Sequence, residues 1–291
     1  MALIGSCLFV GTVRADSTDV LIRALGGGDL QARAEAIQRL AGRGPGGVPD
    51  LEKVVADGSW WAREGALEAL AGMGETGLPT LARVARSDER EEVRRFAARV
   101  IGRIRRPAGR EVLVELMKDA RVRGVAAAAL GEMGDSVAAP LLIRALGDRS
   151  LSVRRASAVA LGKLRDPRAV GPLVRLMADS HQSVRFAAAG ALAGIGPSAA
   201  GALSGALRQA DPLVRALAAE VLGRVGGPEA VSRLLAAAED GDWGVRGAVA
   251  RALGLAGAPP ILPELNAWLG REPDRFVAAQ LRGAIQRIGE K

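Results

Sequence analysis

Few residues of this chain could carry out catalysis. Its 291 residues include one histidine, His181, and one cysteine, Cys7. A zinc site needs several ligands of these types, and a Ser-His-Asp triad would have to combine His181 with Asp179 and Ser180, which are merely its sequence neighbours. A solvated turn residue is the simpler interpretation of His181 in the segment DSHQSVR. We therefore expect no catalytic residue, no metal site, no cofactor and no enzymatic activity.

Arginine is the charged residue with a regular spacing. An arginine returns about every 31 residues, at the head of similar segments such as VRGVAAAALGEMG (122–134) and VRGAVARALGLAG (245–257). Guanidinium groups donate in a planar fork to carboxylates or backbone carbonyls, so we predict a structural role for these residues between neighbouring repeats. The eight repeat arginines are Arg33, Arg63, Arg94, Arg123, Arg154, Arg185, Arg215 and Arg246.

The residues around each arginine predict two helices per repeat. In the first, helix A, the seventh residue after the arginine is always Leu or Ile, and the eighth is always Ala or Gly, which lets a neighbouring helix approach closely. Eleven residues after the arginine, glycine is expected to end helix A in the left-handed conformation, with Arg105 and Arg165 as exceptions. Helix B follows, as in 139–148 and 170–179. Because each helix is too short to be stable alone, each must pack on neighbouring repeats. The glycines concerned are Gly44, Gly74, Gly134, Gly196, Gly226 and Gly257.

This unit, with Asp and Val-Arg entering helix A and Leu-Gly leaving it, resembles the HEAT-like repeats of the phycobilin-lyase type over about residues 18–289. The resemblance implies an all-α fold, a right-handed α-solenoid (α-α superhelix) of about eight to nine HEAT-like repeats of ~31 residues. The resemblance extends to deoxyhypusine hydroxylase, a HEAT-like enzyme that holds metal with His-Glu pairs. This chain has no His-Glu pair, so that activity is excluded.

The resemblance further implies a ladder between repeats, made by an Asp before helix A and the Arg within it. Asp at a helix start also accepts hydrogen bonds from otherwise unpaired backbone N–H groups. The pairs four residues apart are Asp29 with Arg33, Asp119 with Arg123, Asp211 with Arg215 and Asp242 with Arg246, while Asp57, Asp88, Asp148 and Asp179 stand six residues before their arginines.

We expect one solenoid domain over residues 16–291. Residues 18–29 match a helix B and residues 276–289 match a helix A. Residues 1–15 form either an N-terminal cap helix or an export segment: MALIGSCLFVGTV has no charge, and Val13 and Ala15 suit cleavage after Ala15, but a basic n-region is missing. The protein is accordingly cytoplasmic, or exported to the periplasm if residues 1–15 are a truncated signal peptide.

Positive charge is concentrated in the middle of the chain, where residues 90–185 hold 20 basic and 10 acidic side chains. Seven of the basic residues cluster at two equivalent turns between helices A and B, and we call them the basic edge: Arg103, Arg105, Arg106, Arg110, Lys163, Arg165 and Arg168. Arg144 and Arg175 take equivalent places on successive B helices, and the resemblance implies that helix B faces the groove of the solenoid. Trp268 is a further candidate, as an exposed anchor for a partner.

These features favour a non-enzymatic protein-protein interaction scaffold or adaptor that binds an acidic segment of a partner protein through the helix B groove and the basic edge. A nucleic-acid-binding protein is the alternative, because the pI is near 10.9. A phycobilin lyase or lyase-like chaperone is a second alternative, which the resemblance alone suggests. In each case we expect no membrane span and a monomer or a subunit of a complex.

Overall fold

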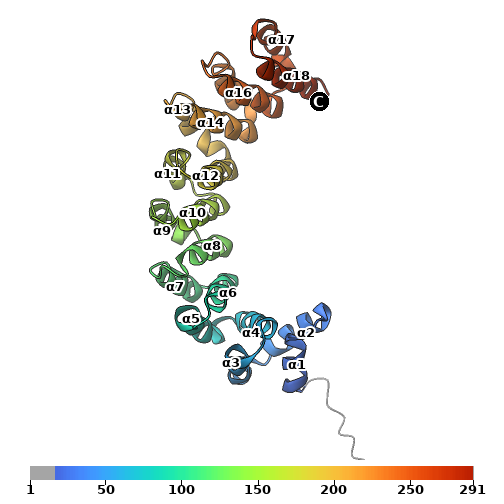
Figure 1. Cartoon of the computed structure of the whole chain (residues 1–291), viewed down its shortest axis with the longest axis vertical. Helices are drawn as coiled ribbons and strands as arrows, with labels where there is room; N and C mark the ends of the chain where they lie inside the picture. Colours follow the sequence, from blue (N-terminus) through green and yellow to red (C-terminus); the bar gives the residue numbers. More distant parts are fainter. Residues whose placement is uncertain (1–16, 291) are drawn as a thin grey trace, which may run out of the picture. The chain divides into compact units, whose positions relative to one another are not determined.

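The computed structural model describes residues 17–290, which form α-helices, short 3-10 helices and turns, without any strand (Figure 1). The prediction of an all-α solenoid is confirmed. The chain divides into two compact units, unit 1 up to Val112 and unit 2 from Leu113 onwards, and we describe each by itself. A single solenoid domain over residues 16–291 stays a prediction. The export segment or cap helix proposed for residues 1–15 lies outside the described residues.

Helices of type A and type B alternate along the described chain, beginning with a B helix and ending with an A helix. The A helices are α2 (Leu30–Ala41), α4 (Trp60–Gly72), α6 (Glu91–Ile101), α8 (Arg123–Met133), α10 (Leu151–Leu164), α12 (Gln182–Ile195), α14 (Pro212–Val225), α16 (Trp243–Ala256) and α18 (Arg275–Gly289). The B helices are α1 (Thr18–Leu25), α3 (Val48–Asp57), α5 (Leu78–Ser87), α7 (Pro107–Leu116), α9 (Ala139–Ala145), α11 (Val170–Leu176), α13 (Ala200–Ala206), α15 (Gly227–Leu235) and α17 (Leu262–Arg271). In unit 2, α8, α10 and α12 lie in one layer and α9 and α11 in a second (Figure 1).

The core follows the predicted register. The Leu or Ile seven residues after each repeat arginine is 0% exposed in every repeat: Leu40, Leu70, Ile101, Leu130, Leu161, Leu192, Leu222 and Leu253. Each side chain of this size contributes about 1.5–3 kcal/mol when it is removed from water. Because every repeat adds one such residue between its helices, the short helices are stabilised by burial and not by their intrinsic propensity.

The turns after helix A adopt the left-handed backbone in most repeats. Five of the six expected glycines have φ between 61° and 80°, and Arg105 (φ 36°) and Arg165 (φ 52°) adopt the same region despite their side chains. A non-glycine residue there costs about 1 kcal/mol. At Gly257 the prediction is wrong, because its φ is −71° and its ψ 162°. Glycine is required at this position for space, since a Cβ would lie 2.5 Å from the Leu253 carbonyl oxygen.

Close contacts between small residues set the spacing of the A helices in unit 2. A Cβ added to Gly162 on α10 would lie 2.7 Å from the Ala191 Cα on α12, and one on Gly223 would lie equally close, at 2.7 Å, to the Ala252 Cα. Gly131 and Gly254 stand in the same place on α8 and α16. A Cβ added there would lie 2.6 Å from the Ala160 Cα and 2.9 Å from the Ala284 Cα, respectively. The glycine eight residues after the repeat arginine therefore meets an alanine of the next repeat, as the sequence predicted in outline.

One interface in unit 2 departs from this arrangement. Between α12 and α14 the glycine is replaced by Ala193 and the facing alanine by Val221. These added methyl groups hold the two backbones apart, and α12 packs less extensively on α14 than the other A helices of unit 2 pack on one another. The α4–α6 interface of unit 1 carries the same pair of types, Ala71 and Val100, and is similarly reduced.

Candidate functional site

The repeat arginines of unit 2 form a ladder between successive repeats. The Arg154 Nε donates to Asp179 Oδ2 at 2.7 Å and its Nη2 to Asp179 Oδ1 at 3.0 Å, while its Nη1 donates to the Asp148 carbonyl at 2.9 Å. Arg123 pairs with Asp148 at 3.0 Å, Arg215 with Asp240 at 2.7 Å and Arg246 with Glu272 at 2.8 Å. The guanidinium groups of Arg154, Arg215 and Arg246 thus join the turn before their own helix to the acid before the next A helix, whereas Arg123 makes only the second contact among the described residues.

The acids of the ladder stand six residues before the position of the repeat arginine in the next A helix, not four residues before it. In α18 that position is occupied by Ala278. Asp29, Asp211 and Asp242 instead cap helices, as when Asp242 Oδ1 accepts from the Val245 N–H at 3.0 Å. The expected pairing of Asp29, Asp211 and Asp242 with arginines four residues later is therefore wrong, because the cap geometry turns these carboxylates toward their own helix N-termini. Asp240 and Glu272 were not identified from the sequence as acids of the ladder, although Asp240 stands six residues before Arg246 and Glu272 six residues before Ala278.

The ladder is incomplete at Arg185. Its Nη1 donates to the carbonyls of Asp179 and Ser180, as in the other repeats, but the place of the acid in the next repeat is taken by Gln209. This gap coincides with the reduced α12–α14 interface. In unit 1, Arg63 also donates to carbonyls, those of Val55 and Ala56, instead of to a carboxylate.

The ladder makes the stability of unit 2 depend on pH. Hydrogen bonds from Arg154 lower the pKa of Asp179, and those from Arg246 lower the pKa of Glu272. These carboxyls titrate near about 4 in an unfolded chain, so their contribution is present above that range and is lost as the pH falls through their lower folded pKa. We expect the urea midpoint of the wild type to fall below about pH 4. The deficit of Asp179→Asn relative to the wild type should shrink over the same range, and an unchanged deficit at pH 2.5 would contradict the assignment.

Most of the basic edge is occupied by internal contacts. Lys163 pairs with Glu132, and Arg103 lies 3.2 Å from Glu68. Arg168 donates from Nε and Nη2 to the carboxylate of Asp166, which is only 6% exposed and caps the following 3-10 turn. Arg168 is therefore held at its own turn although its side chain is exposed.

Three residues of the basic edge remain exposed and unpaired. Arg105, Arg106 and Arg165 make no side-chain hydrogen bond or ion pair with residues 17–290. Arg110 is half-buried on α7. The basic edge thus offers fewer charges to a ligand than its sequence suggests.

Trp268 is not an exposed anchor. It is 4% exposed, and its indole Nε1 donates to Glu272 Oε2 at 3.0 Å, so it supports the carboxylate that holds Arg246. Trp268 has no counterpart in the other repeats. From sequence alone, such a residue can be either an exposed anchor or a core residue of the terminal repeat.

His181 lies exposed at the start of α12, as expected. Its Nδ1 is 2.9 Å from Ser180 Oγ and 3.6 Å from Asp179 Oδ1. A catalytic triad needs the serine and the aspartate on opposite ring nitrogens, and here both approach the same one. This arrangement does not activate Ser180.

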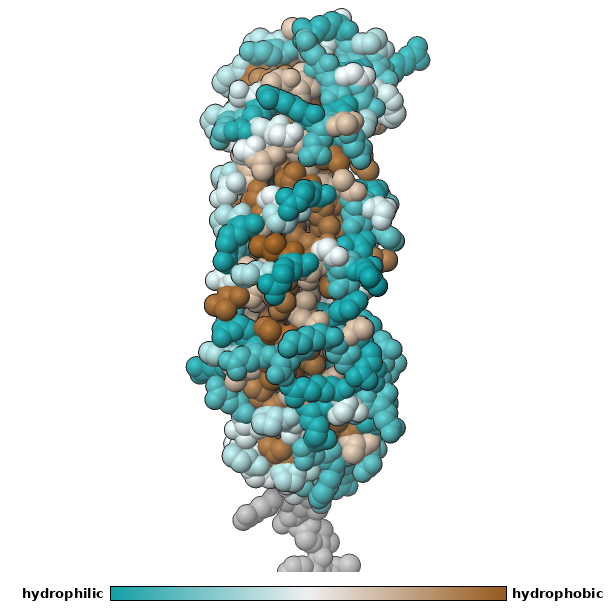
Figure 2. Space-filling model, turned by 90° about the vertical axis from the view of Figure 1, so that its left-hand side faces the viewer, coloured by the Kyte–Doolittle hydropathy of each residue, from teal (hydrophilic) through white to brown (hydrophobic). Residues whose placement is uncertain are grey.

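The surface of the B helices in unit 2 carries hydrophobic side chains between polar borders. Figure 2 shows this face, with brown residues along its middle in the upper part, where α9, α11 and α13 lie, and teal residues on both sides. A pocket of about 410 Å³ opens between α9 and α11, and its apolar lining consists of Ile143, Leu146, Gly147, Pro172, Leu176 and Ala178. We call it the α9–α11 pocket.

Two arginines with no internal partner stand at the α9–α11 pocket. Arg144 on α9 and Arg175 on α11 are exposed, and neither makes a side-chain hydrogen bond or ion pair with the described part of the chain. The acid in the lining, Asp179, is already held by Arg154. The pocket thus combines an apolar floor with two uncompensated positive charges.

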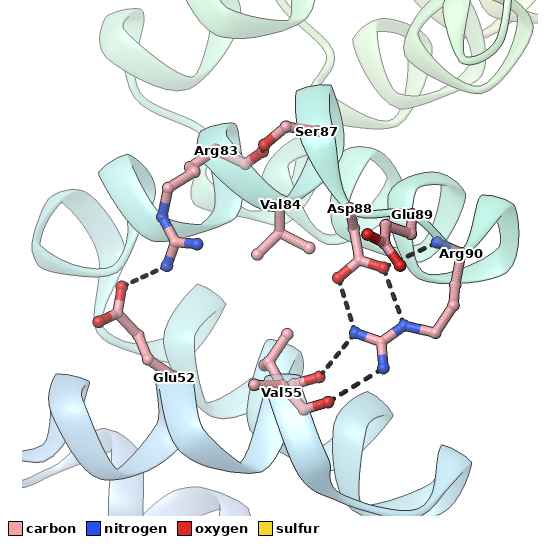
Figure 3. A pocket seen from close by; sticks show the side chains of 9 residues that line it. Glu52, Val55, Arg83, Val84, Ser87, Asp88, Glu89 and Arg90 are labelled. Atoms are coloured by element: carbon pink, nitrogen blue, oxygen red, sulfur yellow. Dashed lines mark hydrogen bonds and ion pairs between the residues drawn. The ribbon is translucent and has the colours of Figure 1, made fainter.

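A comparable pocket in unit 1 has its charges paired. It has a volume of about 370 Å³ and lies between α3 and α5, with Val84 pointing into it (Figure 3). On one side Arg83 donates to Glu52 at 2.6 Å, and on the other Arg90 binds Asp88 and the carbonyls of Val55 and Ala56 (Figure 3). A ligand here would have to break these contacts, so the α9–α11 pocket is the stronger candidate.

Two further features of the described residues concern metal ligands and apolar helices. No group of three or more His, Cys, Asp or Glu side chains there could hold a metal ion. One stretch, 182–206, is long and apolar enough to cross a membrane. It consists of two helices, α12 and α13, separated by a turn at Gly196, and 44% of its most apolar window is buried within the protein.

The geometry of stacked A–B pairs agrees with a family of known proteins. The sequence model of the HEAT-repeat family matches residues 78–161, 144–205 and 199–286, which together are more than half of the chain. The chain belongs to the HEAT-repeat family. No curated protein sequence matches this HEAT-repeat protein.

Several solved structures are similar to this chain. Importin β has a TM-score of 0.58 and 17% identity, over 94% of this chain and 45% of importin β. Human deoxyhypusine hydroxylase is 25% identical over 85% of this chain and 97% of its own, with a TM-score of 0.39. The complex of CpcE and CpcF of phycocyanin lyase from Nostoc sp. PCC7120 is 21% identical, over 72% of this chain and 94% of that one, with a TM-score of 0.42. The match to importin β shows a common fold.

Proposed function

We propose that this HEAT-repeat protein is a non-enzymatic interaction scaffold, and that the B-helix surface of unit 2 binds an acidic segment of a partner protein. The observation that carries the proposal is the α9–α11 pocket with Arg144 and Arg175 beside it. A scaffold built from repeats offers an extended surface to which a partner segment can bind.

Arg144 and Arg175 can bind a ligand directly because neither has a side-chain partner among residues 17–290. A carboxylate that approaches Arg144 or Arg175 forms a charge-assisted hydrogen bond without first breaking another. At Lys163 or Arg168, in contrast, it would have to displace an existing carboxylate. We therefore place the main binding site at the pocket and give Arg165, which belongs to the same unit, a supporting role in attracting the partner.

The apolar floor favours a protein over a nucleic acid as the partner. Phosphate backbones are bound chiefly by basic side chains, whereas Ile143, Leu146 and Leu176 can bury apolar side chains of a peptide. Charges attract the segment and the apolar contacts keep it bound.

The double substitution Arg144→Glu/Arg175→Glu tests the proposal. Peptides selected from a random 12-residue library against the full chain should be enriched in acidic and apolar residues. Their binding, measured by fluorescence anisotropy at 150 mM salt, should weaken about tenfold or more in the variant, because each reversed charge removes an attraction and adds a repulsion.

A matched control is Arg149→Glu/Arg155→Glu, which makes the same change of charge at two exposed arginines that do not line the pocket. Equal losses in both variants would show that only net charge matters. Should labelled 20-base single strands or duplexes bind more tightly than every selected peptide, with a steep dependence on salt, the partner is a nucleic acid and the proposal is wrong.

A further inference from the structure

Three successive B helices of unit 2 each present one arginine without an internal partner. Arg144 and Arg175 stand at equivalent places on α9 and α11, and Arg208 follows the end of α13. All three are exposed and make no side-chain hydrogen bond or ion pair with residues 17–290. We call them the arginine row.

The spacing of the row follows from the stacking of the repeats. Packed helices lie about 8–10 Å apart, so Arg144 and Arg175 stand about 8–10 Å apart across α9 and α11, and the step to Arg208 is somewhat longer because α12 and α14 are held apart. Arg208 is displaced by about one helical turn along its repeat, a distance that the long arginine side chain can span.

A polyproline II segment matches this spacing. It has three residues per turn and rises about 3.1 Å per residue, so every third side chain lies on the same face at about 9.3 Å. In a β-strand, side chains on one face repeat at about 6.8 Å and fall out of register with the row. In an α-helix, side chains seven residues apart on one face are about 10.5 Å apart, which is longer than the spacing of packed helices, so the third acid would overshoot the third arginine.

We propose that the partner segment is an extended, polyproline II-like chain with an acidic residue at every third position, which crosses α9, α11 and α13 with one carboxylate on each arginine of the row. This inference rests on the proposed function and specifies the chemistry of the partner. The residue after the first acid lies over the α9–α11 pocket, whose lining of Ile143, Leu146 and Leu176 takes an apolar side chain. The resulting pattern is acidic, apolar, any residue, repeated.

The neighbouring repeats limit the length of the pattern. Glu115 on α7 takes the place that Arg144 has on α9, and Glu239, after α15, takes the place of Arg208. A fourth acidic residue at either end would meet a carboxylate, and the Arg271 guanidinium beside Glu239 is already paired with it at 3.4 Å. The segment is therefore bound best with three acids.

Capped, fluorescein-labelled peptides test the register on the full chain by fluorescence anisotropy at 150 mM salt. The peptide (Glu-Leu-Pro)3 places three acids in the proposed pattern, and Leu before Pro favours extended backbone. A permuted peptide, Glu-Glu-Glu-Leu-Leu-Leu-Pro-Pro-Pro, has the same composition and charge. We expect the first peptide to bind about tenfold more tightly, since only it can use all three arginines at once. A four-unit peptide should gain little.

Single substitutions assign the effect to the row. Arg175→Ala should weaken the binding of (Glu-Leu-Pro)3 about tenfold, and Arg208→Ala should also weaken it, because each removes one charge-assisted pair. Arg155→Ala, an exposed arginine on α10, is the control and should leave the affinity unchanged.

Equal affinity for the two isomers, or tighter binding of a helical peptide with glutamates seven residues apart, would overturn the register. The peptides from the library selection are measured alongside. If they bind through Arg144 and Arg175 while the isomers do not differ, only the register is wrong. If no acidic peptide binds at all, the proposed function fails as well.

Discussion

Substitution of Gly162 by valine is expected to destabilise the stack of α10 on α12 by about 3 kcal/mol or more. A Cβ at this position would lie 2.7 Å from the Ala191 Cα and 3.0 Å from its Cβ, so the two backbones must separate to admit the side chain. Because each repeat contacts only its neighbours, the separation cannot be absorbed elsewhere. The midpoint of urea unfolding, followed by circular dichroism, measures the effect.

The matched control is Gly190→Ala on α12. Gly190 is helical and exposed, and nothing lies within 4 Å of the place where its Cβ would be. Alanine there should stabilise the helix by about 0.5–1 kcal/mol through its higher helix propensity. If Gly162→Val were as mild as this control, the close approach of α10 to α12 would not be a determinant of stability.

The sequence was most informative about features that recur in every repeat. The buried Leu or Ile and the turn glycine each follow from a local requirement, and eight copies of the first and six of the second in one chain reveal it. The α1 and α18 helices were also expected, from residues 18–29 and 276–289. Gly257 departs from the predicted left-handed conformation because α16 ends in an extended backbone there. That ending depends on Ile261 and Ile288, whose side chains pack against Gly257.

Pairing between repeats was harder to predict. The acid that binds Arg154 stands 25 residues later, and nothing local distinguishes it from the capping acid near the same turn. An aspartate two residues before a helix cap can turn toward the preceding repeat, whereas the cap itself cannot. This difference in direction appears only when the repeats are stacked.

The candidate site was predicted in part. Equivalent places on successive B helices correctly singled out Arg144 and Arg175 as neighbours, and the structure places both at one pocket. Sequence could not show that these two are unpaired while Lys163 and Arg168 are paired, because pairing depends on the reach of side chains from adjacent turns. Arg208 was overlooked because it is displaced along its helix from the place of the other two.

Substitution of Arg154 by alanine is expected to lower the free energy of unfolding by about 2–3 kcal/mol. The side chains of Arg154 and Asp179 are 12% and 8% exposed, and the guanidinium donates to both carboxylate oxygens and to two carbonyls of its own turn. Its loss leaves the nearly buried carboxylate of Asp179 without its main donor. Urea unfolding at pH 7 measures the change.

The gap in the ladder supplies the control for this prediction. Arg185 makes the same carbonyl contacts but faces Gln209 instead of an acid, so Arg185→Ala should cost about 1 kcal/mol, less than half the effect at Arg154. Conversely, Gln209→Asp should restore a carboxylate for Arg185 and stabilise the α12–α14 interface by up to about 1 kcal/mol. Equal losses at Arg154 and Arg185 would mean that the carbonyl contacts alone hold the turns together. In that case the carboxylates of Asp148, Asp179, Asp240 and Glu272 would contribute to the ladder's specificity of pairing and not to its stability.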